Sequence, residues 1–137
     1  MNYLLDTNVI SELVSAKPNK QVLSWFEQIP TNTLFLSVLT LGEIRKGIEK
    51  VQEGQRKNKL LIWLEHELTD MFGERILPIS LEIADRWGKL QGQVKRTMPA
   101  IDSLIAATVL HHDMALVTRN GVDFEDFPGL EVINPWH

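Results

Sequence analysis

The sequence predicts an α/β fold of three layers, α/β/α, in which helices cover both faces of a mainly parallel sheet of about five short strands. Two observations support this prediction. Short apolar segments typical of strands alternate with longer segments in which apolar residues recur every three or four positions, as on one face of a helix. One or two helical segments separate successive strands, and crossover connections of this kind join parallel strands.

Length and composition indicate one globular domain. The chain has 137 residues, a length at which a single core is usual, so we expect a single domain over residues 1–137. It has no cysteine, which excludes disulfide scaffolds, thiolate nucleophiles and iron–sulfur sites and suits a reducing compartment. No apolar run is long enough to span a membrane, and Asp6 interrupts the run where a signal peptide would continue. We expect a cytoplasmic protein.

The N-terminal part contains the first two strands. Tyr3–Leu5 is a short apolar strand that ends at Asp6, and Leu34–Leu36 is the second strand. Between them, amphipathic helices begin at about Asn8 and at about Asn19.

Two further helices follow the second strand. Ser37 suits the N-cap of the first of them. Its apolar stripe consists of Leu41, Ile44, Ile48 and Val51. The stripe of the second helix consists of Leu60, Leu64, Leu68 and Met71, and Gly73 ends it.

The C-terminal part contains the other strands, which are Ile76–Ile79, Ala115–Val117 and Glu131–Ile133. Pro78 indicates an edge position or an irregular end for the first of these, because proline cannot donate a ladder hydrogen bond. Ser80 suits the N-cap of one intervening helix, and Pro99 suits the first turn of the next. The apolar faces of these helices are Ile83, Trp87, Leu90 and Val94, then Ile101, Leu104, Ile105 and Thr108.

Four acidic residues lie where a parallel α/β sheet usually binds its ligand, beyond the carboxyl ends of the strands. Asp6 ends the first strand, Asp123 follows the fourth, Asp102 lies in the first turn of a helix, and Glu43 lies two turns into another. Each acid also has an ordinary role open to it, as a helix cap, a first-turn acid, a solvated side chain or a turn residue. Glu43 and Asp102, however, lie beside the apolar stripes of their helices.

Convergence of these four acids would create a cation site. Carboxylates that share a site repel one another at neutral pH unless a cation or a proton neutralises them. An oxygen-only ligand set selects Mg²⁺ or Mn²⁺ over zinc. Such an ion lowers the pKa of a bound water and holds a phosphodiester for in-line attack, so the expected reaction is metal-dependent phosphodiester hydrolysis.

The same residues resemble the motifs of PIN-domain ribonucleases, and specifically of VapC-type toxins of bacterial toxin–antitoxin pairs. The resemblance extends over nearly the whole chain. It rests on Leu5–Asp6–Thr7–Asn8, Glu43–Ile44 with Gly47, Asp102 with Ile105–Ala106–Ala107, and Thr118–Arg119–Asn120 with Asp123–Phe124. The final Asn134–Pro135–Trp136 also resembles the ends of many such toxins. Four motifs in this order, each in its expected strand or helix context, make the resemblance specific.

The resemblance implies a metal-dependent endoribonuclease that is the toxin of a type II toxin–antitoxin pair. The implied catalytic residues and ligands of Mg²⁺, with Mn²⁺ as a substitute, are Asp6, Glu43, Asp102 and Asp123. Supporting roles fall to Thr7 and Thr118, through hydrogen bonds, and to Asn120, which would shape its loop. Glu125 or Asp126 could share the role of Asp123.

The resemblance also implies partners. These are an RNA substrate, a second copy of the chain in a homodimer, and a small VapB-like antitoxin that blocks the active site from a groove beside it. Two basic clusters could be ordinary solvated helix faces or a rim that contacts RNA phosphates. They consist of Arg45, Lys46, Lys50, Arg56, Lys57 and Lys59, and of Arg86, Lys89, Lys95 and Arg96. Trp87 fits an apolar stripe, whereas Trp25 and Trp63 flank theirs and could contact a protein partner.

Other folds with acids at strand ends fit less well. A receiver domain needs adjacent acids after the first strand, where this chain has Thr7–Asn8, and a haloacid-dehalogenase-like phosphatase needs an aspartate at the position of Asn8. Dinucleotide binding needs a glycine-rich turn, which is missing there. A non-catalytic PIN-like module that binds RNA or protein remains the alternative, and RNA cleavage that a chelator abolishes would distinguish the two.

Overall fold

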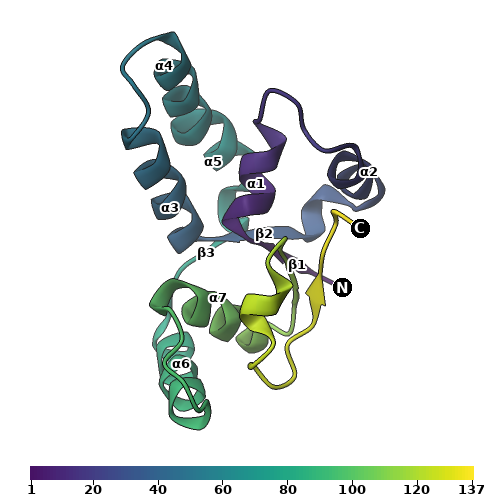
Figure 1. The fold of residues 1–137 in the computed structure, drawn as a ribbon, viewed down its shortest axis with the longest axis vertical. Helices are drawn as coiled ribbons and strands as arrows, with labels where there is room; N and C mark the ends of the chain where they lie inside the picture. The colour runs from purple at the N-terminus through teal and green to yellow at the C-terminus, as the bar shows by residue number, and fades with distance from the viewer.

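The computed structural model describes residues 1–137, and its strands form one parallel sheet in the order β3-β2-β1-β4-β5 (Figure 1). The strands are β1 Tyr3–Leu5, β2 Leu34–Ser37, β3 Ile76–Leu77, β4 Ala115–Val117 and β5 Val132–Ile133. β1 lies in the middle, where Leu4 is in register with Phe35 of β2 and with Leu116 of β4. The predicted α/β fold with a parallel sheet is confirmed.

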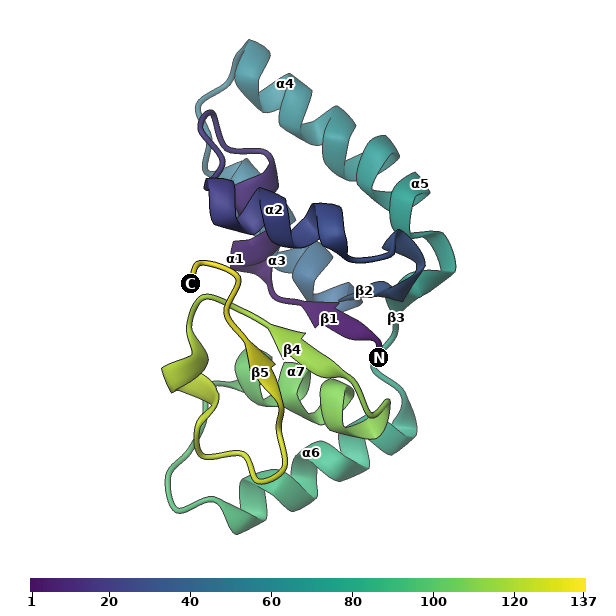
Figure 2. The ribbon, with the colours of Figure 1, turned by 90° about the vertical axis from the view of Figure 1, so that its right-hand side faces the viewer.

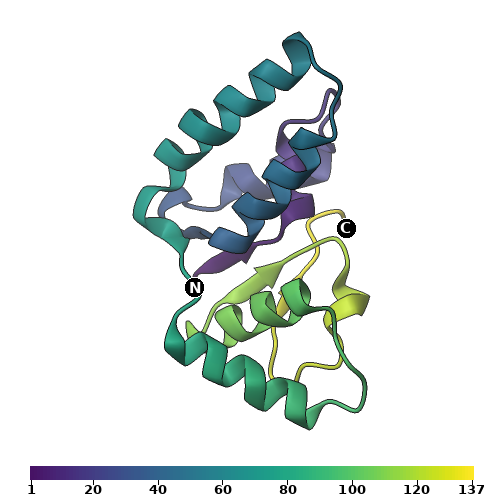
Figure 3. The same ribbon diagram turned by 90° about the vertical axis from the view of Figure 1, so that its left-hand side faces the viewer.

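Helices cover both faces of this sheet (Figures 2 and 3). They are α1 Thr7–Leu13, α2 Lys20–Gln28, α3 Val38–Glu49, α4 Gln55–Ile62, α5 Thr69–Phe72, α6 Leu81–Gln93 and α7 Ala100–His111. A π-helical segment, Trp63–Leu68, joins α4 to α5. None of the helices is long and apolar enough to cross a lipid bilayer.

Two apolar cores lie on opposite faces of the sheet. Successive residues of a strand point to opposite faces, so neighbours in β1 belong to different cores. Leu4 packs into the core formed with α6 and α7, whereas Leu5 packs into the core formed with α1 and α3, and both side chains are fully buried. The sheet is therefore the shared wall between the two helical layers.

The predicted N-caps occur at the helix starts. The Ser37 hydroxyl accepts a hydrogen bond from the backbone N–H of Leu39 at 3.1 Å, which begins α3 after β2. The Ser80 hydroxyl does the same for Ile83 at the start of α6. Each cap satisfies a backbone donor that has no partner in the first helical turn.

Two details of the predicted faces are wrong. Met71 is 49% exposed, and its neighbour Phe72 fills the core position instead. In α7, the predicted inner residues Ile101 and Leu104 are only half-buried, whereas Ala106 and Ala107 are fully buried. α7 packs between the sheet and α6, and small side chains allow this close approach. The third strand ends at Leu77 rather than Ile79, and it lies at the sheet edge as predicted.

Candidate active site

Asp6 is the buried centre of the candidate site. It follows β1 and caps α1, with its Oδ1 accepting the backbone N–H of Thr7 at 2.9 Å. Its Oδ2 accepts the Thr118 hydroxyl at 2.8 Å. Only 8% of the Asp6 surface is exposed. Asp6 is therefore both an ordinary helix cap and a buried, hydrogen-bonded carboxylate.

The ends of β1 and β4 are joined by side chains as well as by the sheet. Asn8 donates through Nδ2 to the Thr118 hydroxyl at 3.2 Å and accepts the backbone N–H of Arg119 through Oδ1 at 3.1 Å. In the sequence, Asn8 belongs to the first motif but has no predicted role. Its position two residues after the strand-end acid was the available signal, but the contact spans more than a hundred residues and becomes visible only once β1 pairs with β4.

Glu43 comes to the site from α3. Its Oε1 accepts the Thr7 hydroxyl at 2.7 Å, so Thr7 connects the start of α1 to this carboxylate. Ile44 and Ile48 of the same helix are buried in the adjoining core, which fixes the face that Glu43 occupies. The predicted supporting contacts of Thr7 and Thr118 are thus present as hydrogen bonds to Glu43 and Asp6.

Asp102 is held in place by a network around its neighbour Ser103. The buried Ser103 hydroxyl accepts hydrogen bonds from Trp87 Nε1 at 2.8 Å and from Gln91 Nε2 at 2.9 Å, both on α6. The same hydroxyl lies 2.9 Å from the carbonyl of Pro99, to which it can donate. The first turn of α7, and with it Asp102, is thereby fixed against α6.

Asp123 lies on the exposed rim of the site, in a short 3-10 turn, Gly121–Phe124. Its backbone N–H donates to the carbonyl of Asn120 at 3.0 Å, and the N–H of Asn120 donates to the Thr118 hydroxyl at 3.1 Å. Asn120 therefore shapes the loop through its backbone. Asp126 pairs with Arg96 at 2.7 Å on the surface.

The four acids share one electrostatic environment. Burial is the main cause that raises the pKa of Asp6, and the charges of Glu43 and Asp123 raise it further. Burial also raises the pKa of Asp102 to about 6, and the charges of Asp6, Asp123 and Glu43 contribute in that order. Charges from three other segments thus oppose the ionisation of Asp102, as in a site that neutralises its carboxylates with a cation.

The residues fit a hard divalent cation in chemistry and in charge. The candidate donors are carboxylate oxygens, with no nitrogen or sulfur among them, and such sets favour Mg²⁺ or Mn²⁺. No three acidic or histidine side chains are close enough, as they lie, to ligate one ion together. Binding of one ion by three of them would require the carboxylates to move towards one another.

A groove of about 360 Å³ adjoins this site between α1, α3 and α4. Thr7 and Glu43 line its end nearest to Asp6. Its apolar lining consists of Val14, Ile44, Ile48, Val51, Leu60 and Trp63. Trp63, which the sequence suggested for contact with a protein partner, thus lines this groove.

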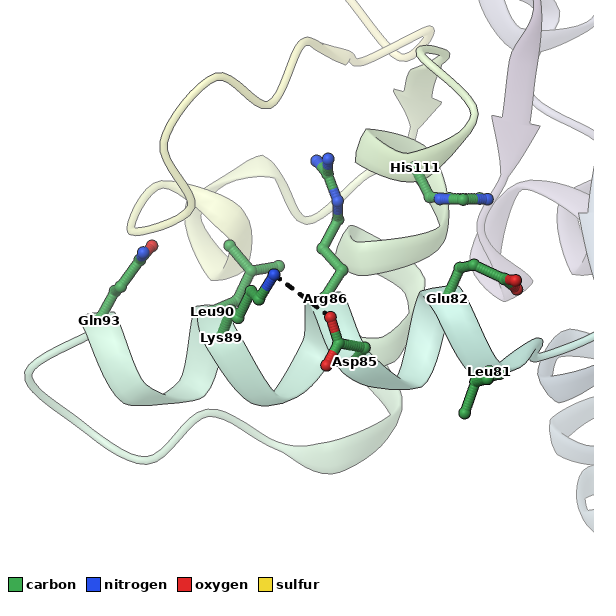
Figure 4. A pocket seen from close by; sticks show the side chains of 8 residues that line it. All are labelled: Leu81, Glu82, Asp85, Arg86, Lys89, Leu90, Gln93 and His111. Atoms are coloured by element: carbon green, nitrogen blue, oxygen red, sulfur yellow. Dashed lines mark ion pairs between the residues drawn. The ribbon is translucent and has the colours of Figure 1, made fainter.

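A second hollow, of about 600 Å³, lies along α6 (Figure 4). It contains His111 at the end of α7 opposite to Asp102, and its Asp85 and Lys89 are paired at 3.3 Å. None of the residues that line this hollow belongs to the acidic site.

Several members of the two basic clusters are neutralised by acids. The pairs are Arg45–Glu65, Lys57–Glu53, Lys89–Asp85 and Arg96–Asp126. For these residues the ordinary interpretation, a helix surface with internal ion pairs, fits the contacts.

Residues 3–130 match the PIN domain family. The chain belongs to this family. As a PIN domain it is 38% identical to a VapC ribonuclease of Sinorhizobium fredii over 136 residues, which covers 97% of this chain and 96% of that one. It is 34% identical to the toxin FitB of Neisseria gonorrhoeae, with 98% of each chain covered. The resemblance to VapC-type PIN proteins is confirmed.

Solved structures agree with this assignment. The PIN domain superimposes on a chain of FitAB bound to a DNA fragment with a TM-score of 0.91 at 33% identity, covering 98% of this chain and 96% of that one. The TM-score is 0.89 at 34% identity for a chain of FitAcB from Neisseria gonorrhoeae, with 98% and 99% covered.

Proposed function

We propose that this PIN domain is a metal-dependent endoribonuclease and the toxin of a type II toxin–antitoxin pair. The observation that carries the proposal is that the charges of Asp6, Asp123 and Glu43 all act on Asp102, beyond the carboxyl ends of the strands. The similarity to a VapC ribonuclease and to the toxin FitB supports it.

In this proposal the four acids hold Mg²⁺ or Mn²⁺. When bound, such an ion supplies an activated water and charge stabilisation for attack on a phosphodiester. The chain's own hydrogen bonds do the orienting: Thr118 holds Asp6 Oδ2, and Thr7 holds Glu43 Oε1. The raised pKa of Asp102 means that it takes up a proton near pH 6, so full ligand charge requires a pH above that value.

The groove beside the site is the proposed place of an antitoxin segment. Half of its lining residues are apolar, and Glu43 also lines it, so a partner helix with apolar residues and a terminal basic side chain would fit both. A basic group delivered there would neutralise the acids in place of a metal ion. The similarity of this chain to the toxin FitB, and to a chain of the FitAB complex bound to DNA, supports the proposal of a protein partner.

A homodimer is also proposed, from the resemblance to VapC-type toxins. Light scattering at micromolar concentration should give twice the chain mass of 15.7 kDa, and a monomer in the absence of partner would contradict it.

The test of the catalytic proposal is cleavage of a mixed RNA pool by the purified chain. We expect cleavage with Mg²⁺ or Mn²⁺, none with a chelator, and growth arrest on expression that co-expression of a neighbouring short reading frame relieves. A soluble, folded chain that binds RNA and leaves it intact with either ion would favour the non-catalytic module instead.

A further inference from the structure

Arg119 is a cation with no carboxylate partner at the edge of the acidic site. It is exposed, and it takes part in none of the ion pairs of the structure. Its guanidinium instead lies over the ring of Trp136, 5.2 Å from the ring centre. Stacking on an aromatic face orients a guanidinium while leaving its N–H donors free in the plane.

The backbone of Arg119 is fixed on both sides. Its N–H donates to Asn8 Oδ1 at 3.1 Å, and its carbonyl accepts Asn134 Nδ2 at 3.3 Å. Asn134 Oδ1 in turn accepts the backbone N–H of Trp136 at 2.9 Å. Asn134 therefore fixes the backbone of both Arg119 and Trp136. The final residues of the chain thus support the Arg119 side chain.

The neighbours of Arg119 belong to the acidic site, but its charge does not act there. Thr118, the preceding residue, holds Asp6, and yet Arg119 is not among the groups that shift the pKa of Asp6 or Asp102. A cation that is fixed beside an acidic site without neutralising it is available to an external anion.

Asn134, which donates to the carbonyl of Arg119, also lines a hollow that could accept more of such a ligand. A hollow of about 500 Å³ lies between α2 and the C-terminal segment, and its lining includes Asn134, Lys20, Gln21 and Trp25. Figure 2 shows this final segment beside α2 and the end of β4. This hollow offers a second cation without an ion pair, Lys20, together with amide side chains and the ring of Trp25. Proteins bind single-stranded nucleic acid with this combination of groups.

We propose that Arg119 binds a backbone phosphate of the RNA next to the acidic site, with Trp136 as the residue that positions its guanidinium. The proposal rests on the proposed ribonuclease function and adds a subsite to it. Arginine donates in a fork that matches phosphate oxygens, so the contact orients the strand relative to the acids.

The first test measures binding of a single-stranded RNA oligonucleotide by fluorescence anisotropy, in chelator to prevent cleavage, over a series of salt concentrations. Arg119→Gln should weaken binding about tenfold at low salt and reduce the slope of log K against log salt by about 0.7, the value for one phosphate on a single strand. Arg45→Gln on α3 removes the same charge from an exposed arginine that pairs with Glu65, and it is the matched control. It should leave both quantities unchanged.

The second test separates the stacking from the charge. Trp136→Leu keeps the arginine but removes the ring, so the KM for RNA should rise severalfold with kcat nearly unchanged and the salt slope kept. Trp136→Phe retains a ring and should restore most of the affinity. A purely structural role for Trp136 would instead lower the amount of folded protein in both variants, which thermal unfolding would detect.

The outcomes are distinct from those of the catalytic test. If the wild type cleaves RNA and Arg119→Gln binds it with wild-type affinity and slope, the phosphate subsite is wrong and the ribonuclease proposal stands. If Arg45→Gln loses as much as Arg119→Gln, the effect is one of total charge and the subsite is also wrong. If the wild type neither binds nor cleaves RNA, both proposals fail.

Discussion

Asp6 has two roles that usually belong to different residues, a helix cap and a buried carboxylate. It caps α1 through Oδ1, and it presents Oδ2 to a hydroxyl and an amide in a setting where burial and neighbouring charges oppose its ionisation. Capping is a job that asparagine does as well as aspartate, whereas ligation of a cation requires the charge. A single isosteric change therefore separates the two roles.

Asp6→Asn should abolish cleavage and leave the protein folded. We expect activity to fall by ~100-fold or more, because even groups one shell removed from a metal are worth 10–100-fold. The melting temperature in chelator should stay within a few degrees of wild type or rise, because one of the mutually repelling charges is gone. Asp70→Asn, at an exposed position on α5, is the control for charge alone. A folded Asp6→Asn variant with wild-type cleavage would remove Asp6 from the site.

Asp102 should make the metal-free protein less stable as the pH rises. Its pKa is raised from 3.8 to about 6 in the folded state, so between these values the native protein holds a proton that the unfolded chain has lost. The stabilisation is complete below the lower value and is lost as the pH rises through about 6.

The measurement is thermal unfolding in chelator between about pH 5 and 7, a window that brackets the raised pKa of Asp102. The wild-type melting temperature should fall across this window relative to that of Asp102→Asn, whose amide does not titrate. Parallel curves for the two proteins would show that Asp102 ionises in the folded state as it does in the unfolded chain.

At the scale of elements, α6 fixes the start of α7 through one hydroxyl. Trp87 and Gln91 both donate to the Ser103 hydroxyl, and these bonds also fix the backbone of the adjacent Asp102. Trp87→Phe removes one donor and should cost about 1 kcal/mol, whereas Ser103→Ala leaves both donors unpaired and should cost about 1–3 kcal/mol.

A double-mutant cycle tests this coupling. In the Ser103→Ala background the indole N–H already lacks its acceptor, so Trp87→Phe should be nearly neutral or stabilising there. Denaturant unfolding gives the energies, and the metal affinity of each variant reports how well Asp102 is still presented. Additive costs would mean that the hydrogen bond to Ser103 contributes nothing of its own.

The elements differ in how far the sequence predicts them. Ser37 and Ser80 were predicted as caps because a cap depends on the few residues that follow it. Met71 was wrongly placed in the core because the helical repeat was extended through Trp63–Leu68, where the chain is π-helical. The wider turn of a π-helix moves the buried face onwards, so Phe72, four residues after Leu68, replaces Met71, three residues after it.

The sequence predicts part of the site, because the positions of some acids depend only on the order of strands and helices. Strand ends in a parallel sheet share an edge, so Asp6 and Asp123 could be placed together from the order of elements alone. The contacts of Asn8 with Thr118 and of Arg119 with Trp136 depend on which strands are neighbours and on side-chain direction. Neither is encoded within a local window of residues.

At the scale of the whole molecule, the acids come from both helical layers. Glu43 belongs to α3, whose Ile44 and Ile48 pack in one core, whereas Asp102 belongs to α7, whose Ile105 packs in the other. The sheet lies between the two cores, and the site spans the pairing of β1 with β4. A cation held by all four acids would therefore connect the layers at the edge where their charges now repel one another.

The last prediction follows from that position: Mg²⁺ should stabilise the folded protein as a whole. An ion that binds only the folded state at a concentration about a hundred times its Kd adds about 2.7 kcal/mol, or about 10 °C in melting temperature for a domain of this size. The shift should be larger at pH 8 than at pH 5.5, because protons compete for Asp102 below its raised pKa. Asp6→Asn should lose the shift and Asp70→Asn should keep it. An equal shift in Asp6→Asn would place the ion elsewhere on the protein, and a pH-independent shift would show that Asp102 is not one of its ligands.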